Sequence, residues 1–472
     1  MSYSTIILST LNARYMHTAF GLRYIYANMA DLQTATKIVE FTIQESPINI
    51  VEQLLLHKPK IIGFSVYIWN VLEVTKTVAM LKQVAPEVTI ILGGPEVSHN
   101  PDNPDVVVLA DYVISGPGEE SVPTLCNQLL SGERPEQKFI EAKALPLDEL
   151  KLPYEYYTDD DIKNRLIYVE ASRGCPFKCE FCLSALDKTS TPFPLDNFLA
   201  EMDKLLERGV RNFKFIDRTF NLKISTTVTI LEFFLERMSD DLYLHFELVP
   251  DNLPEKLKEV LQRFPSSSLQ FEIGVQTFDP EIQTRISRKQ NNEKSKANIK
   301  WLRENTGAHL HTDLIFGLPS DNLENFGHSF DQLIALRPHE IQLGILKRLR
   351  GAPLNRHNKH YQLCYNPEPP YNILSTKTID FTTMQRVNRF ARYWDMIGNS
   401  GRFSHTLPLI LGDQPFDRFI LLSDALHQRA GSSWKIALKR LFELIYTILN
   451  EDFGLDDAVI KQYLAVDYER AK

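Results

Sequence analysis

Three cysteines stand close together in the stretch SRGCPFKCEFCL, residues 172–183, and they are three of the five cysteines in the chain. Thiolates are soft ligands that suit zinc or iron–sulfur clusters. A structural zinc site takes four protein ligands, and no CxxC or HxxxH pattern nearby completes one here. A cubic four-iron cluster held by Cys175, Cys179 and Cys182 would leave one iron with an open coordination position. The spacing therefore favours a cluster with an open iron over a zinc knuckle or free thiols.

The cysteine loop directly follows a strand-like segment, and further segments of this kind alternate with helix-like ones along the next 180 residues or so. The strand-like segments are LIYVEAS (166–172), NFKFIDRTF (212–220), LYLHFELVP (242–250), LQFEIGVQTF (269–278), HLHTDLIFGLP (309–319) and HEIQLGILKRL (339–349). Six such units predict a partial or full TIM-type (β/α)6 barrel, in which chemistry lies at the carboxyl ends of the strands. The cysteines would then lie at the mouth of the barrel.

This combination resembles the radical S-adenosylmethionine (SAM) superfamily: a CxxxCxxC loop after the first barrel strand, with the aromatic Phe181 just before the last cysteine. The resemblance implies that Cys175, Cys179 and Cys182 hold a 4Fe–4S cluster and are essential for catalysis. It implies further that the amino and carboxylate groups of SAM chelate the open iron. Electron transfer would then cleave SAM and release a 5′-deoxyadenosyl radical.

Three polar residues further along the chain are similar to those of the coproporphyrinogen dehydrogenase-like branch of that superfamily. By this resemblance Gln276 and Asp313 hydrogen-bond the ribose hydroxyls of SAM, and Arg288 pairs with its methionyl carboxylate. The chemistry suits these side chains, because an amide and a carboxylate satisfy a diol and a guanidinium matches a carboxylate bidentately. Each residue taken alone reads equally well as a polar loop residue.

Asp217 is a further candidate for contact with SAM. Many relatives carry two glycines and an acid after the second barrel strand, where this chain reads FKFIDRTFNLK. Relatives that bind cobalamin often show a similar acidic version, so the resemblance suggests Asp217 as a SAM contact. A helix cap or a salt-bridge partner is the alternative.

The first 143 residues contain short Ile- and Val-rich runs that alternate with helical patterns. The strand-like runs are STIILST, TKIVEFTI, KIIGFSVYI, VTIILGG and DYVISG. This alternation predicts right-handed crossovers and a doubly wound, flavodoxin-like parallel sheet. Ligands of such sheets bind beyond the carboxyl ends of the strands, where Ser65, Gly93 and Gly94 stand.

A doubly wound domain ahead of such a barrel resembles the cobalamin-binding domain of the cobalamin-dependent radical SAM subgroup. The resemblance implies that Ser65, Gly93 and Gly94 line the slot for the nucleotide tail of cobalamin. The cobalt-ligating loop of such domains reads acid-x-His-x-x-Gly, whereas this chain reads ARYMHTAFG, residues 13–21. His17 is thus a candidate axial ligand to cobalt, with a hydrogen-bonded loop histidine as the alternative. Nucleotide binding without cobalamin also stays open for this domain.

Composition limits the class of protein. The 472 residues are 43% hydrophobic and 24% charged, with a formal net charge of −8, which argues against a broad nucleic-acid surface. No signal-peptide pattern begins the chain, and no run of about 18 apolar residues predicts a membrane span. Cys126 and Cys364 stand alone in the sequence, so a disulfide framework is not expected. These features predict a cytoplasmic protein that does not contact membranes.

The sequence predicts four consecutive parts. These are a cobalamin-binding-like domain (1–143), a proline-rich acidic linker (144–164), the barrel (165–370) and a mainly helical C-terminal domain (371–472). In the last part, SSWKIALKRLFELIYTILNEDFG is apolar at helical spacing. This tail would either cap the barrel mouth and contact substrate, or seal a core.

The resemblance implies a radical SAM enzyme that uses cobalamin to methylate, cyclise or rearrange an unactivated carbon of a small-molecule substrate. Reduced ferredoxin or flavodoxin is the electron donor that the superfamily implies. The alternatives are a radical SAM enzyme without cobalamin, a transfer-RNA methylthiotransferase-like enzyme and a non-catalytic cofactor sensor. The methylthiotransferases carry further N-terminal cysteines, whereas the first 143 residues here contain only Cys126.

Overall fold

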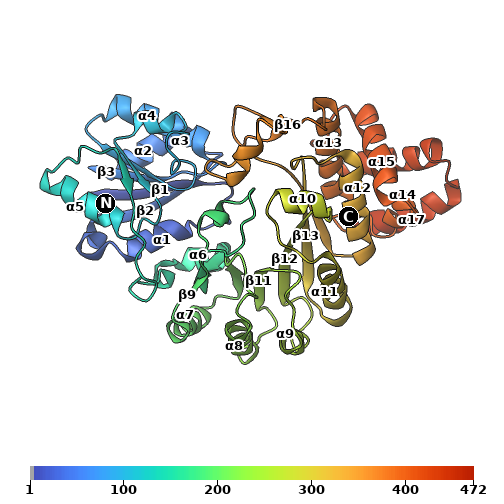
Figure 1. Ribbon diagram of the computed structural model, residues 1–472, viewed down its shortest axis with the longest axis horizontal. Helices are drawn as coiled ribbons and strands as arrows, with labels where there is room; N and C mark the ends of the chain where they lie inside the picture. Colours follow the sequence, from blue (N-terminus) through green and yellow to red (C-terminus); the bar gives the residue numbers. More distant parts are fainter. Residues whose placement is uncertain (1–4, 472) are drawn as a thin grey trace.

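A computed structural model describes residues 5–471. Three parts follow one another from left to right in Figure 1: an N-terminal α/β domain, a barrel-like sheet with its helices below, and a helical C-terminal part. In the described part of the chain, no helix combines the length and apolar character that a membrane crossing requires.

The N-terminal domain is a parallel sheet of six strands in the order β2-β1-β3-β4-β5-β6. Its strands are β1 (Ile6–Asn12), β2 (Thr36–Thr42), β3 (Ile61–Ser65), β4 (Thr89–Gly93), β5 (Tyr112–Ser115) and β6 (Phe139–Glu141). Its helices are α1 (Phe20–Ala27), the 3-10 helix η1 (Ala30–Ala35), α2 (Pro47–Leu55), α3 (Val71–Val84), α4 (Val106–Leu109) and α5 (Ser121–Ser131).

Helices cover both faces of this sheet. Alternate residues of β1 point to opposite sides, so Ile7 packs with α2, α3 and α4 whereas Ile6 packs with α1 and α5. The strands of a sheet that is buried on both faces have continuous apolar sequences, and the Ile- and Val-rich segments of this domain follow that pattern. The predicted doubly wound, flavodoxin-like sheet is confirmed.

The second sheet is also parallel and six-stranded, in the order β14-β13-β12-β11-β10-β7. Its strands are β7 (Ile167–Val169), β10 (Asn212–Phe215), β11 (Tyr243–Leu248), β12 (Leu269–Gln276), β13 (His309–Phe316) and β14 (Glu340–Ile345). The associated helices are α7 (Leu195–Glu207), α8 (Ile224–Leu235), α9 (Glu255–Leu261), α10 (Pro280–Arg285), α11 (Asn292–Asn305) and α12 (Leu323–Leu336). β7 and β14 are the two edge strands and do not pair with each other, so the barrel is open, which confirms the predicted partial barrel.

The two faces of the barrel strands differ in chemistry. Along β12, Phe271 and Ile273 are buried in the hydrophobic core under the outer helices, whereas the alternate residues Glu272 and Gln276 are only partly buried. The polar face borders the interior of the barrel. This barrel therefore encloses a polar chamber and not the layers of branched aliphatic side chains that fill a closed TIM barrel.

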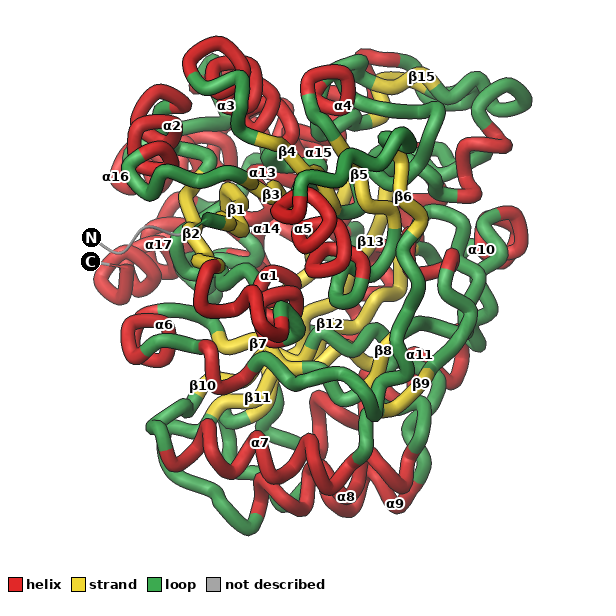
Figure 2. Tube along the Cα trace, turned by 90° about the vertical axis from the view of Figure 1, so that its left-hand side faces the viewer, coloured by secondary structure: helices red, strands yellow, loops and turns green. Residues whose placement is uncertain are grey.

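Small elements connect the two sheets and frame the cysteine loop. They are η2 (Tyr154–Tyr156), α6 (Asp159–Asn164), the pair β8 (Ser172–Arg173) and β9 (Thr191–Pro192), and η3 (Leu183–Leu186). Helix α1 lies between the two sheets in Figure 2, and its residues Phe20 and Tyr24 belong to the core of the barrel. The N-terminal domain is thus packed against the barrel by apolar side chains.

The C-terminal part is mainly helical, as predicted. It contains η4 (Pro353–His357), the pair β15 (Cys364–Tyr365) and β16 (Ile373–Ser375), α13 (Phe381–Ile397), α14 (Leu407–Leu411), α15 (Pro415–Ala430), α16 (Leu438–Thr447), the π-helix η5 (Ile448–Asp452) and α17 (Asp457–Ala471). Trp394 packs against Phe330 of α12 and Phe419 of α15. The amide of Asn399 bonds both the N–H and the carbonyl of Ile341, at 3.0 Å each. The tail therefore covers the free edge of β14.

Candidate active site

A cavity of about 280 Å³ lies at the carboxyl ends of the barrel strands. It is lined by the three cysteines of the loop and by Phe181, Arg218, Glu247, Glu272, Gln276, Arg288 and Asp313, among others. We call it the barrel cavity. It brings together every residue that the sequence analysis assigned to the cluster and to SAM, apart from Asp217.

The backbone of the cysteine loop turns sharply just before Cys175. Gly174 has a φ of +91°, and a Cβ there would lie 2.5 Å from the carbonyl oxygen of Thr189, so only glycine fits. The N–H of Cys175 donates to the carbonyl of Asp187 at 3.2 Å, and the N–H of Cys182 donates to the carbonyl of Cys179 at 3.1 Å. These bonds shape a loop whose three thiols face one cavity.

The thiols suit an iron–sulfur cluster. Burial raises the pKa values of Cys175 and Cys179 and so favours the protonated thiols of the free protein, whereas the nearby Arg288 guanidinium opposes this rise at Cys179 and favours the thiolate that a cluster binds. Within residues 5–471, no three His, Cys, Asp or Glu side chains converge on the position of a single metal ion. A cubic cluster instead takes each thiolate on a separate iron corner. The donor set and its arrangement therefore fit a cluster better than one zinc ion.

Gln276 sits at an irregularity of the barrel sheet. The register between β12 and β13 shifts between Gly274 and Gln276, and Gln276 has a φ of +69°, which is rare for a residue with a side chain. A Cβ on Gly274 would lie 2.5 Å from the side-chain nitrogen of Gln276. The bulge and the glycine together give the amide its place in the cavity, and such strain is typical of functional sites.

Arg288 follows α10 and reaches back toward the cysteine loop. One of its terminal nitrogens lies 3.6 Å from the sulfur of Cys179. Its other N–H groups donate to the carbonyl of Gly274 and to Oε1 of Gln290. A guanidinium held beside the cluster ligands is suitably placed to meet a carboxylate bound at the open iron.

Asp313 carries a buried oxygen, Oδ1, that forms no hydrogen bond with the residues described, although His311 Nε2 lies 3.5 Å away. Burial and the neighbouring carboxylates Glu272 and Glu247 raise the pKa of Asp313 to about 7. An unsatisfied buried acceptor is unfavourable. Hydroxyl donors of a ligand would satisfy this oxygen, so Asp313 fits the ribose contact that the resemblance implies.

The sequence analysis missed several charged residues inside the barrel. Burial raises the pKa of Glu272, but His245 and Lys214 outweigh burial and lower the pKa to about 2. Glu247 pairs with Arg218 at 2.8 Å. A signal was present for Lys214, His245, Glu247 and Glu272, because each stands among apolar residues at the two-residue period of a strand, whereas Arg218 follows β10.

Asp217 lies outside the barrel cavity. It is 3% exposed and accepts hydrogen bonds from the N–H of Ala171 at 2.9 Å and from the hydroxyl of Ser172 at 2.6 Å. Burial raises its pKa to about 7. In this structure Asp217 anchors the start of the cysteine loop.

A second cavity, of about 580 Å³, lies between the N-terminal domain and the barrel. We call it the interdomain cavity. Its walls include Thr10, Asn12, His17, Tyr67, Trp69 and Glu119 from the N-terminal domain and Tyr168, Glu170, Arg173 and Ile216 from the barrel. The rings of Tyr67 and Trp69 are stacked, with centroids 4.3 Å apart, and Trp69 is 47% exposed. Flat apolar rings beside polar groups fit a flat ligand with a polar rim, such as a corrin.

Ser65, Gly93 and Gly94 stand at the ends of β3 and β4 but do not line this cavity. The carbonyl of Ser65 accepts a hydrogen bond from the hydroxyl of Thr10 at 2.9 Å. Gly94 has a φ of +103°, and a Cβ there would lie 2.5 Å from the carbonyl oxygen of Val66. The close crossing of two chain segments is thus sufficient reason for this glycine.

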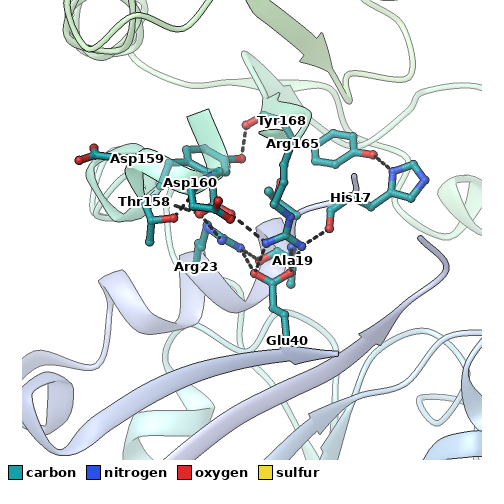
Figure 3. A network of polar contacts seen from close by, with 12 residues as sticks. His17, Ala19, Arg23, Glu40, Thr158, Asp159, Asp160, Arg165 and Tyr168 are labelled. Atoms are coloured by element: carbon teal, nitrogen blue, oxygen red, sulfur yellow. Dashed lines mark hydrogen bonds and ion pairs between the residues drawn. The ribbon is translucent and has the colours of Figure 1, made fainter. Parts of the chain in front are cut away.

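His17 lines the interdomain cavity and contacts the barrel. Its Nδ1 lies 2.7 Å from the hydroxyl of Tyr168, and Arg165 donates a hydrogen bond to its carbonyl oxygen (Figure 3). Burial and the cations Lys214, Arg14 and Arg165 lower its pKa, which favours the neutral imidazole. The structure therefore places His17 at the junction of the two parts.

A buried ion network joins the two parts beside this cavity (Figure 3). Glu40 of β2 pairs with Arg23 of α1 at 2.8 Å and with Arg165 at 2.9 Å, and both arginines also pair with Asp161 at 2.8 Å. Such charges are favourable in a protein interior only when every group is paired. We call these four residues the interdomain network, and they fix how the domain sits on the barrel.

Three protein-family models match separate parts of the chain. A model described as "B12 binding domain" matches residues 7–126, and one described as "Radical SAM superfamily" matches residues 169–333. A third, "Protein of unknown function (DUF4080)", matches residues 359–472.

Individual relatives are distant. The cobalamin-dependent radical SAM methyltransferase TokK of Streptomyces tokunonensis is 24% identical over 359 residues, which are 67% of this chain and 50% of TokK. The uncharacterized methyltransferase PH0819 of Pyrococcus horikoshii is 22% identical over 330 residues, which are 64% of this chain and 70% of PH0819. The chain thus spans half the length of TokK.

Among solved structures, the radical SAM methyltransferase TsrM of Kitasatospora setae, with cobalamin and a 4Fe–4S cluster bound, has a similar fold. The TM-score is 0.59 at 16% identity, and the match covers 74% of this chain and 77% of TsrM. The chain belongs to the radical SAM superfamily. Within it, the chain belongs to the cobalamin-dependent subgroup, in which a B12 binding domain accompanies the barrel, so its cofactors are a 4Fe–4S cluster, SAM and cobalamin.

Proposed function

We propose that this protein is an enzyme that cleaves SAM reductively and transfers a methyl group to an unactivated carbon of a small-molecule substrate. The arrangement of the two cavities is the observation that carries this proposal. Glu170 and Arg173 line the interdomain cavity, whereas Cys175 lines the barrel cavity. After β10, Ile216 lines the interdomain cavity and Arg218 lines the barrel cavity. The two cavities therefore share walls at two neighbouring strand ends, so a substrate in the barrel would lie between the two cofactor sites.

When bound, the cluster and SAM supply an electron and the radical, and cobalamin supplies the methyl group. The protein positions these partners. Arg288 pairs with the SAM carboxylate, Gln276 and Asp313 hold its ribose, and Phe181 packs beside the cluster ligands. Asp217 acts through the cysteine loop that it anchors. The polar strand face inside the barrel offers hydrogen bonds to a polar substrate.

On the N-terminal side, we propose that the corrin lies against Tyr67 and Trp69 and that its nucleotide tail follows Ser65, Gly93 and Gly94 at the ends of β3 and β4. His17 contributes to the wall through its bond with Tyr168. The predicted boundaries 1–143, 144–164, 165–370 and 371–472 belong to the same proposal, as does the cytoplasm as a reducing compartment for the open cluster.

Reduced ferredoxin or flavodoxin remains the proposed electron donor. Three exposed basic residues stand at the cysteine loop or beside residues that contact it: Lys178, Lys289 and Arg356. Arg356 bonds Glu180 of the loop, and Lys289 follows Arg288, which contacts Cys179. Local positive charge on a protein with a net charge of −8 would steer an acidic donor toward the cluster.

Cyclisation or rearrangement is the second candidate reaction, because the same cavities would also hold a substrate radical that closes a ring or rearranges instead of accepting a methyl group. Methylation is favoured because TokK and TsrM, whose domains this chain resembles, are methyltransferases. The two reactions differ in their products. Methylation with SAM as methyl source releases S-adenosylhomocysteine, whereas the other reactions form 5′-deoxyadenosine without it.

The first test is the cobalamin content of protein purified and reconstituted without oxygen, after unbound corrinoid is removed. We expect about one cobalamin per chain and, with reductant, SAM cleavage to 5′-deoxyadenosine. Essentially no cobalamin beside an intact cluster would contradict the role of the interdomain cavity. Absence of SAM cleavage in cluster-loaded protein would contradict the enzymatic function and favour a sensor.

A further inference from the structure

Glu180 is a buried carboxylate inside the cysteine loop, between Cys179 and Phe181. Its side chain is only 6% exposed. Burial of a charged group is unfavourable unless other groups pair with it and donate hydrogen bonds to it. An apolar residue would pack in this place more simply, so the contacts of the carboxylate indicate its role.

Two separate segments donate to this carboxylate. From the turn after α10, the hydroxyl of Ser287 donates at 2.6 Å. From η4, Arg356 donates through Nε at 2.9 Å and Nη2 at 2.6 Å, and His357 Nε2 lies 2.9 Å away. The carboxylate is thus held from both sides.

The backbone of Glu180 bonds the same two segments. Its N–H donates to the carbonyl of Ile286 at 2.9 Å, and its carbonyl accepts from the N–H of Leu354 at 2.9 Å. Main chain and side chain therefore clamp the cysteine loop to the α10 turn and to η4. We call this set of contacts the Glu180 clamp.

On the first side, the clamp reaches the residue that we assign to the SAM carboxylate. Ser287 directly precedes Arg288, and Ser287 has a φ of +54°, a backbone conformation that side chains disfavour. Its bond to Glu180 supports this turn. The clamp thereby fixes the distance between Cys179, a ligand of the cluster, and the guanidinium 3.6 Å from it.

On the second side, η4 continues a segment that contacts the N-terminal domain. Arg350 pairs with Glu96 at 2.8 Å, and Arg348 pairs with Asp102 at 2.5 Å. Glu96 and Asp102 belong to the segment after β4, just beyond Gly93 and Gly94. The same segment of the chain therefore contacts both the loop that carries the cluster ligands and the domain that holds cobalamin.

We infer that Glu180 is a positioning residue for SAM binding: it keeps Arg288 at a fixed place relative to the open iron. This inference rests on the proposed function, because it concerns the same SAM site. Glu180 contacts neither the cavity nor the reacting atoms itself. Its removal should therefore weaken SAM binding while the three cysteines still assemble the cluster.

The test compares Glu180→Gln with Asp321→Asn. The glutamine keeps the size of the side chain but removes its charge and replaces one of the two accepting oxygens by an NH₂ donor. Asp321 is a matched control: it is 3% exposed, accepts hydrogen bonds from backbone N–H groups in the barrel, and lines neither cavity. Both variants thus replace a buried barrel carboxylate by its amide, but only one disturbs the cysteine loop.

For cluster-loaded Glu180→Gln we expect wild-type iron content and a dissociation constant for SAM raised about tenfold or more, the size expected when charge-assisted hydrogen bonds are lost. The SAM-induced change in the spectrum of the reduced cluster should need correspondingly more SAM. Asp321→Asn should bind SAM like the wild type. Wild-type SAM affinity in Glu180→Gln would overturn the inference.

A second measurement needs no cofactor. In the apo protein, amide hydrogen exchange of residues 175–182 and 286–288 should be faster in Glu180→Gln than in the wild type, and unchanged there in Asp321→Asn. Unchanged exchange in Glu180→Gln would overturn the inference even if this variant assembled no cluster. Failure of the wild type to bind SAM would instead contradict the proposed function and leave this exchange result valid.

Discussion

The barrel cavity and the interdomain cavity are built in different ways. The proposed cluster ligands of the barrel cavity come from one loop of eight residues, Cys175 to Cys182, and the proposed SAM contacts come from two adjacent strands and a turn. The interdomain cavity is lined by strand, helix and loop residues of both domains, and these residues meet only after the domains pack. One site is defined mainly within one sheet, and the other by an interface.

This difference has an energetic consequence. Local spacing already restricts where the three thiols can lie, so the cluster site depends little on the rest of the chain. The interdomain cavity depends on the buried interdomain network, whose members are stable only together. The two cofactors should therefore respond to different substitutions.

The largest effect is expected from Cys179→Ala, which removes one of the three proposed cluster ligands. We expect loss of the cluster and of all SAM cleavage, because the loop contains no fourth cysteine that could replace this ligand. Iron content and visible absorbance of anaerobically reconstituted protein measure this. Cobalamin content should remain near that of the wild type, which would separate the two cavities.

The matched control is Cys364→Ala, which removes an exposed thiol that lines neither cavity. It should keep both the cluster and SAM cleavage. Full cluster content in Cys179→Ala would show that the loop is not the cluster site.

A somewhat smaller effect is expected from Glu40→Ala in the interdomain network. It leaves the buried guanidinium groups of Arg23 and Arg165 with one carboxylate partner, Asp161, so we expect a loss of about 3–5 kcal/mol in stability. The denaturant midpoint of the apo protein should fall, and cobalamin content should fall with it while iron content is retained.

The control here is Glu73→Gln, which breaks the surface pair with Lys76 in the same domain. An exposed ion pair contributes about 0–1 kcal/mol to stability, so the denaturant midpoint of Glu73→Gln should hardly differ from that of the wild type. An equal shift in both variants would mean that the interdomain network does not hold the interface.

Both sheets and the cluster loop could be predicted from the sequence because their signals are local. The apolar runs of β1, β3 and β4 are buried on both faces, and the cysteine spacing is a property of one loop. The group of Gln276, Arg288 and Asp313 was also predicted and shares one cavity in the structure.

The interdomain network and the Glu180 clamp could not be predicted in the same way. Glu40 and Arg165 are 125 positions apart, and Glu180 and Arg356 are 176 apart. Nothing in either local sequence indicates the partner, because an acid or a base reads as a solvated surface residue until its environment is known. Pairings of this kind depend on how the domains pack.

A smaller effect, limited to pH, concerns Asp313. Its pKa is raised to about 7 in the free site, and ribose hydroxyls would donate to its ionised form and lower that pKa. SAM affinity should therefore rise with pH up to about 7 and level off above it, by at most about tenfold per pH unit. Binding of SAM to cluster-loaded protein between pH 6 and 8 measures this.

In Asp313→Asn this pH dependence should weaken, because the amide does not titrate. Glu272 contributes no slope in this range, since its pKa of about 2 keeps it ionised. SAM affinity that falls as the pH rises from 6 to 7 would contradict an ionised Asp313 as the ribose contact.

The smallest effect is expected from His17→Gln, and it sharpens the description of the interdomain cavity. Nδ1 of His17 is bonded to Tyr168, and the carbonyl oxygens of Tyr15 and His17 both accept from Arg165, so the loop is fastened to the barrel. A histidine held in this way is a wall residue, and we expect the variant to keep the cobalamin content and visible spectrum of the wild type. The decisive measurement is the paramagnetic resonance spectrum of bound Co(II) cobalamin in both proteins. Nitrogen splitting that is present in the wild type and lost in His17→Gln would identify His17 as the axial ligand instead, and the interdomain cavity would then hold its metal by a local residue, as the barrel cavity does.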